Sequence, residues 1–87
     1  MNKKEDIILL IEDEVQMRHF LRVAIENEQY RLLEADTAKV GLTMAASWNP
    51  DIVLLKLGLP DMEGIDVIGR LREWCKAPII IISAREQ

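Results

Sequence analysis

Short, apolar, β-branched runs alternate along the chain with stretches of helix length, and this alternation constrains the fold more than any other feature. Repeated strand-helix-strand units predict an α/β fold, in which helices connect the strands of a parallel sheet. The predicted order is βαβαβαβ. The expected strands are 7–11, 30–34, 51–55 and 79–82. The strand at 30–34 is short and half polar, which favours a place near an edge of the sheet.

Apolar residues at helical spacing predict the face that each helix packs against the sheet. For the helix at 14–27 the face is Met17, Phe20, Leu21, Ala24 and Ile25. The second helix has a face of Leu42, Ala45 and Ala46, and the third, at 65–74, has Ile65, Ile68 and Leu71. Thr37 is expected to cap the second helix, and Asn49-Pro50 to end it. Trp48 and Trp74 are interpreted as packing residues, and His19 as a surface residue.

The composition excludes several classes of protein and partner. A chain of 87 residues with 49% hydrophobic and 30% charged residues fits one small packed domain. Its net charge of −4 gives no general attraction to nucleic acid or to anionic lipid, so neither is expected as a partner. The single Cys75 excludes an internal disulfide. With no signal peptide and no apolar run near the ~20 residues that span a bilayer, we expect a soluble protein of the reducing cytoplasm.

Polar residues follow three of the predicted strands at the point where each strand ends. Glu12 and Asp13 follow the first strand, Lys56 and Gly58 follow the third, and Ser83 follows the fourth. The carboxyl ends of parallel strands meet at one edge of the sheet, where ligands bind, so these residues are expected to converge. Adjacent carboxylates repel unless a cation lies between them, and Mg²⁺ is the usual one. The segment IEDEVQ has no glycine, which disfavours a dinucleotide site.

Four segments together resemble bacterial response-regulator receiver domains over the entire chain: IEDE, NPDIVLL, LGLPDMEGIDVI and PIIIISARE. The stretch LKLGLPDMEGIDVIGRLREW is similar in detail to the KdpE branch of that family, whose members typically read LDLGLPD. The resemblance implies a flavodoxin-like (CheY-like) sheet of order 2-1-3-4. It also implies a role in a two-component phosphorelay that controls transcription, through binding rather than enzymatic catalysis. The implied partner is a sensor histidine kinase.

The resemblance further implies Mg²⁺ held by Glu12, Asp13 and the carbonyl of Gly58, with Ser83 on a phosphoryl oxygen. The family places its phosphate-accepting aspartate at position 56, where this chain has Lys56. An ammonium cannot form an acyl phosphate. We therefore expect a phosphorylation-incompetent receiver in which Lys56 pairs with the two carboxylates and Mg²⁺ binding is weak or absent. Three alternatives remain: an active receiver with an engineered or artefactual Lys56, an orphan interaction module, and ordinary capping or solvated roles for these side chains.

The chain ends at Gln87, before the fourth helix, fifth strand and fifth helix of the family. Residues 1–87 are thus expected to form only the N-terminal part of a receiver domain. The isoleucine strand at 79–82 would then be an edge strand with unpaired backbone groups. Self-association of the chain is the expected consequence.

Overall fold

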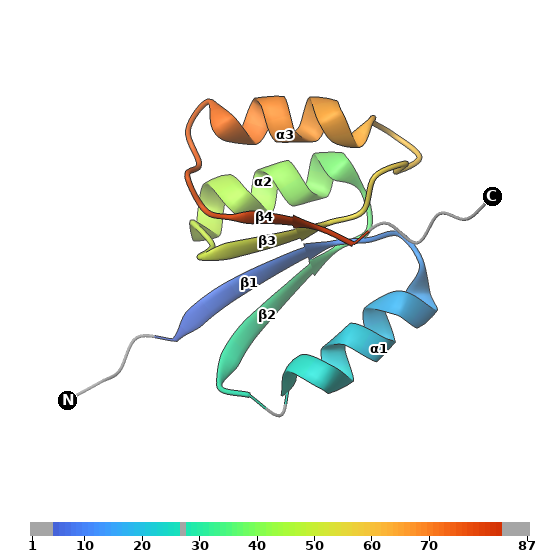
Figure 1. The fold of residues 1–87 in the computed structure, drawn as a ribbon, viewed down its shortest axis with the longest axis vertical. Coiled ribbons are helices and arrows are strands. Elements are labelled where there is room, and N and C mark those ends of the chain that lie inside the picture. The colour runs from blue at the N-terminus through green and yellow to red at the C-terminus, as the bar shows by residue number, and fades with distance from the viewer. Residues whose placement is uncertain (1–4, 27, 83–87) are drawn as a thin grey trace.

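The computed structural model describes residues 5–26 and 28–82. This part contains four parallel strands and three helices (Figure 1). The strands are β1 (Asp6–Ile11), β2 (Tyr30–Ala35), β3 (Ile52–Leu55) and β4 (Ile79–Ile81), and the helices are α1 (Val15–Glu26), α2 (Ala38–Trp48) and α3 (Gly64–Arg72). The sheet order β2-β1-β3-β4 confirms the predicted topology, with β2 at one edge. No helix of the described part is both long and apolar enough to span a membrane.

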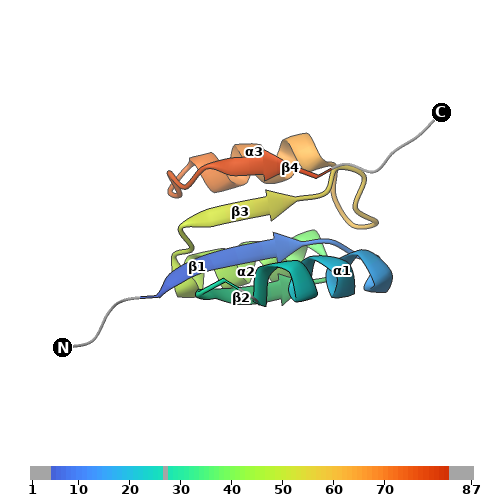
Figure 2. The same ribbon diagram turned by 60° about the horizontal axis from the view of Figure 1, so that its bottom comes forward.

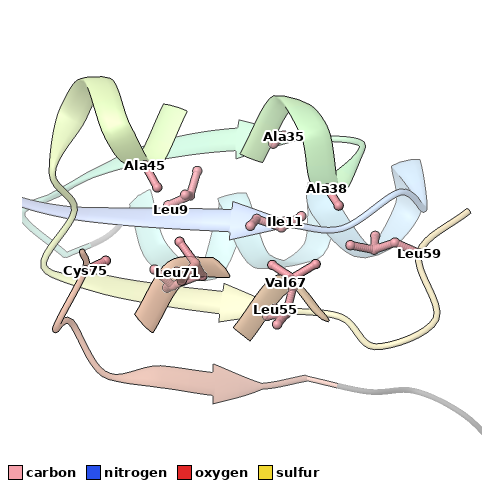
Figure 3. Packing of buried hydrophobic residues seen from close by; sticks show 11 residues of the cluster. Leu9, Ile11, Ala35, Ala38, Ala45, Leu55, Leu59, Val67, Leu71 and Cys75 are labelled. Atoms are coloured by element: carbon pink, nitrogen blue, oxygen red, sulfur yellow. The ribbon is translucent and has the colours of Figure 1, made fainter. Parts of the chain in front are cut away.

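The helices cover the two faces of the sheet unequally. Helices α2 and α3 lie on one face, and α1 lies on the other, beside β2 (Figures 1 and 2). The main core fills the space between the sheet and the α2–α3 layer (Figure 3). It is made of side chains from β1, β2, β3, both helices and two loops: Leu9, Ile11, Ala35, Ala38, Ala45, Val53, Leu55, Leu59, Val67, Leu71 and Cys75.

Strand β1 is the centre of this architecture. It pairs in parallel with β2 on one side and with β3 on the other, so that Ile11 has both Ala35 and Leu55 as partners. Leu9, Leu10 and Ile11 each have 0% of their surface exposed. An apolar strand buried on both faces is what its sequence predicts for a parallel sheet.

The predicted packing faces of the helices are wrong in part. In α1 no residue is buried, and Phe20 is 65% exposed. Ile65, expected on the packing face of α3, is 75% exposed, and Ala46 of α2 is also exposed. The two tryptophans interpreted as packing residues, Trp48 and Trp74, are 42% and 48% exposed.

Small residues explain why the face of α2 differs from the expected one. The buried residues of α2 are Ala38, Gly41 and Ala45. A Cβ placed on Gly41 would lie 2.5 Å from Ile11 Cδ1. The helix axis therefore lies closer to β1 than any side chain at position 41 would permit, and the larger apolar residues are left at the flanks of the helix.

The ends of α2 agree with the sequence prediction. The backbone N–H of Val40 donates to Thr37 Oγ1 at 3.1 Å, which confirms the predicted N-cap. At the other end, Asn49 adopts a left-handed conformation with φ 51°, and its N–H donates to the carbonyl of Ala45. The helix thus ends immediately before Pro50.

Candidate functional site

The site lies where β1 and β3 end side by side. The pairing of the two strands continues one step past their ends, because the backbone N–H of Lys56 donates to the carbonyl of Ile11 at 3.0 Å. On the other side of β1, the N–H of Glu12 donates to the carbonyl of Ala35 at 3.0 Å. These bonds hold Glu12 and Lys56 next to one another, as the predicted topology requires.

The expected ion pair is present between Lys56 and the acidic residues. Lys56 Nζ lies 2.9 Å from Asp13 Oδ1 and 3.5 Å from Glu12 Oε2. The side chains of Lys56, Asp13 and Glu12 are 19%, 32% and 1% exposed. The hydrogen bond to Asp13 raises the pKa of Lys56, and the same bond lowers the pKa of the Asp13 carboxyl. Lys56 is therefore a protonated, partly buried cation at the end of β3.

Glu12 also acts as a helix cap. Its Oε2 accepts a hydrogen bond of 3.0 Å from the backbone N–H of Glu14, one residue before α1 begins. A carboxylate suits this place because the first N–H groups of a helix lack partners within the helix. The capping interpretation of Glu12 and its pairing with Lys56 thus both hold for the same carboxylate.

Of the other two expected site residues, the structure describes only Gly58. Gly58 is exposed, two residues beyond Lys56, and has a positive φ of 75°, a backbone conformation that favours glycine. Ser83 lies outside the described residues. Among the described residues, the structure brings together Glu12, Asp13 and Lys56.

The donor set beside Lys56 does not fit a resident divalent cation. Among residues 5–26 and 28–82 no group of three or more His, Cys, Asp or Glu side chains is arranged to hold a metal ion. A cation between Glu12 and Asp13 would meet an ammonium that already contacts both carboxylates. Mg²⁺ demands near-ideal octahedral oxygen ligation, so it would have to displace Lys56 to bind here.

Sequence reasoning did not assign Arg18 to the site. Arg18 Nη1 donates to the backbone carbonyl oxygens of Glu12 at 3.0 Å and Asp13 at 3.3 Å. Its Nε lies 3.5 Å from Glu34 Oε1, and Glu34 in turn accepts two hydrogen bonds from Arg22 at 2.7 and 2.9 Å. The bonds from Arg22 are the main reason that the pKa of Glu34 is lowered. The spacing of arginines along α1 carries no signal for backbone contacts of this kind.

Asp61, in the loop after β3, has a structural role. Its two carboxylate oxygens accept hydrogen bonds from the backbone N–H groups of Ala38 at 2.9 Å and Lys39 at 3.0 Å. These bonds lower the pKa of Asp61 and join the loop after β3 to the N-terminus of α2. Gly58 lies in the same loop, so Asp61 helps to hold the loop at the edge of the site.

The sheet order and the acidic pair at the end of β1 define a receiver domain, and comparison with known proteins supports this class. The family described as "Response regulator receiver domain" matches residues 8–87, so the chain belongs to this family. Within the family it is similar to KdpE transcriptional regulators. It is 46% identical over 80 residues to KdpE of Escherichia coli K12, and 47% identical over 79 residues to KdpE of Mycobacterium tuberculosis H37Rv. The chain is therefore a response-regulator receiver domain that is similar to KdpE transcriptional regulators.

The matches cover most of this chain but a minority of each relative. They span 92% of the chain and 36% of the Escherichia coli protein, and 91% of the chain and 35% of the Mycobacterium tuberculosis protein. The chain thus spans about a third of the length of these relatives.

Solved structures confirm the fold. The MaeR response regulator bound to beryllium trifluoride superposes with a TM-score of 0.85 at 26% identity, over 94% of this chain and 70% of that one. The receiver domain of a LuxO repressor protein from Vibrio parahaemolyticus gives a TM-score of 0.89 at 24% identity, over 97% and 65%.

Proposed function

We propose that this receiver acts in a KdpE-like transcriptional regulator without accepting a phosphoryl group. The observation that carries the proposal is the contact of 2.9 Å between Lys56 Nζ and Asp13 Oδ1. Lys56 occupies the family's acceptor position, where a carboxylate would be needed to form an acyl phosphate. Because the neighbouring Asp13 raises the pKa of Lys56, the amine stays protonated at neutral pH and is not a nucleophile.

The same charge arrangement supports two further parts of this proposal. Mg²⁺ binds weakly or not at all, because Lys56 already neutralises part of the negative charge of Glu12 and Asp13. The domain works by binding other proteins rather than by catalysis, and a sensor histidine kinase is the partner that the KdpE-like relatives suggest.

Incubation with acetyl phosphate and Mg²⁺, followed by intact-mass spectrometry, tests the proposal. The unmodified chain should gain no acid-stable, hydroxylamine-sensitive phosphoryl group, because it lacks a carboxylate at the acceptor position. The matched variant is Lys56→Asp. If only this variant is phosphorylated, Lys56 is the reason that the unmodified chain is not. That result would also fit an ancestral receiver that was phosphorylated at position 56. A phosphoryl adduct on the unmodified chain would overturn the proposal.

Self-association through β4 is a second candidate function, and the exposure of this strand favours it. Ile80 and Ile81 are 48% and 41% exposed. The carbonyl of Pro78 and the N–H of Ile82 bond to β3. By the alternation of a parallel strand, the backbone N–H and C=O groups of Ile79 and Ile81 therefore point away from β3, toward the open edge. A strand of a second chain can pair with these unbonded backbone N–H and C=O groups and cover the exposed isoleucines.

A further inference from the structure

Arg18 contacts the loop between β1 and α1, residues 12–14, in a way that its place in the helix does not require. It lies in the first turns of α1, and its guanidinium folds back over the start of the helix. There Nη1 donates to the carbonyl oxygens of Glu12 and Asp13, at 3.0 and 3.3 Å. These carbonyls precede the helix and therefore take no part in its own hydrogen bonding. The side chain of Arg18 is 18% exposed, so these bonds are partly shielded from water.

A role in anchoring α1 to β2 does not explain why Arg18 bonds to the loop carbonyls. Arg22 already performs that task, since its Nε and Nη2 donate to the two carboxylate oxygens of Glu34 at 2.7 and 2.9 Å. Arg18 reaches Glu34 only at 3.5 Å. Its shortest contact is to the loop, so Glu34 orients the guanidinium of Arg18 while the loop receives its hydrogen bonds.

The two carbonyls that Arg18 binds belong to the peptide groups on either side of Asp13. Holding both peptide groups restricts the backbone torsion angles of Asp13, and these angles set the direction in which its side chain leaves the backbone. The neighbouring Glu12 is held by its own bonds, from its N–H to Ala35 and from Glu14 to its carboxylate. For Asp13, Arg18 donates to the backbone carbonyl and Lys56 donates to the carboxylate.

We propose that Arg18 is a positioning residue, which fixes the loop so that the Asp13 carboxylate meets the Lys56 ammonium. The inference rests on the proposed function, because it assigns the cause of the contact on which that function depends. Arg18 donates to the backbone carbonyls of Glu12 and Asp13 and not to their carboxylates, so it acts on the ion pair only through the backbone.

Nuclear magnetic resonance of the lysine ammonium groups tests this role. An ammonium held in an ion pair exchanges its protons slowly enough to give its own ¹⁵N–¹H signal, and Lys56→Arg identifies which signal is that of Lys56. We expect Arg18→Met to abolish this signal through rapid exchange with water. Arg18→Lys, which keeps a donor on the same helix turn, should retain part of it.

Arg22→Met is the matched control, because Arg22 binds Glu34 more closely than Arg18 but does not touch the loop. It should leave the Lys56 signal unchanged while lowering thermal stability. Equal loss of the signal in both methionine variants would overturn the inference, and so would its survival in Arg18→Met or its absence from the unmodified chain. If Arg18→Met does not fold, Arg18→Lys takes its place in the test. The reference is then Asp13→Ala, in which Lys56 has lost its partner. A Lys56 signal in Arg18→Lys as weak as that in Asp13→Ala would also overturn the inference. The phosphorylation assay gives its result independently of these signals.

Discussion

At position 56, a single side chain places a cation beside the acidic pair. Lys56 supplies one positive charge at the end of its own side chain, with Nζ 2.9 Å from Asp13 Oδ1 and 3.5 Å from Glu12 Oε2. A divalent ion would supply two charges but would also need four or more further oxygen ligands at fixed angles. The lysine needs only the two carboxylates that already face it. Removing it would leave those carboxylates in place without their cation.

Lys56→Ala should therefore bind Mn²⁺ or Mg²⁺ more tightly than the unmodified chain. The gain should be about tenfold or more, since one unit charge within 4 Å near a protein surface is worth more than the ~1.4 kcal/mol that corresponds to a factor of ten. Isothermal titration calorimetry measures both affinities. Lys76→Ala is the control, because Lys76 is an exposed lysine beyond α3. Tight binding to the unmodified chain that the alanine does not change would show that Lys56 is no competitor for the metal.

At the scale of single elements, two glycines in helix interiors, Gly41 and Gly69, have opposite surroundings. A Cβ on Gly41 would lie 2.5 Å from Ile11 Cδ1, whereas a Cβ on Gly69 in α3 would meet nothing within 4 Å. Gly41 is therefore required by the approach of α2 to β1, while Gly69 only weakens the propensity of its helix.

The same substitution should thus have opposite effects at these two positions. Gly41→Ala should lower the free energy of unfolding by about 1–3 kcal/mol, because the core around Ile11 must shift to admit the methyl group. Gly69→Ala should raise it by about 0.5–1 kcal/mol through helix propensity. Urea denaturation followed by circular dichroism measures both. Stabilisation by Gly41→Ala would mean that α2 can move away from the sheet without cost.

Residue patterns along the chain predicted the elements well but their side-chain contacts only in part. The presence of four strands and the Thr37 cap follow from local signals, namely β-branched runs and a hydroxyl before a helix, whereas the strand order was implied by the resemblance to receiver domains. The pairing of Lys56 with Asp13 follows from the meeting of strand ends. The hydrogen bonds that Asp61 accepts from the N-terminus of α2 span 22 and 23 positions and follow from no periodicity. The apolar Phe20 and Ile65 misled because apolar residues at helical spacing do not specify which side of the helix the sheet covers.

For the whole molecule, the two edges of the sheet differ in how they resist further pairing. The β2 edge has charged residues, with Arg31 stacked 4.8 Å from the ring of Trp48 and Glu34 paired with Arg22. The β4 edge has three isoleucines and no charge. Charged residues discourage edge-to-edge association, and an uncharged apolar edge permits it.

Sedimentation velocity should therefore detect association of the chain, above its monomer mass of 10.0 kDa, at high micromolar concentration. Ile80→Lys should restore the monomer, because a charge on the edge cannot be buried between two sheets without a partner. Val40→Lys is the control, since Val40 is similarly exposed, at 41%, but lies on α2 away from the edge. A folded monomer at all concentrations, or equal loss of association in both variants, would exclude β4 as the contact.

The central position of β1 has a consequence during protein synthesis. This strand is made first, yet its partners follow much later, since Ile11 pairs with Ala35 and Leu55. At ribosomal rates of about 5–20 residues per second, β1 waits about 1–5 s for β2 and about 2–9 s for β3. For that time the stretch Ile7–Ile11, apolar throughout, has none of the burial that it finally reaches. The most deeply buried strand of the domain is thus also the segment that a nascent chain must keep from other apolar surfaces for longest.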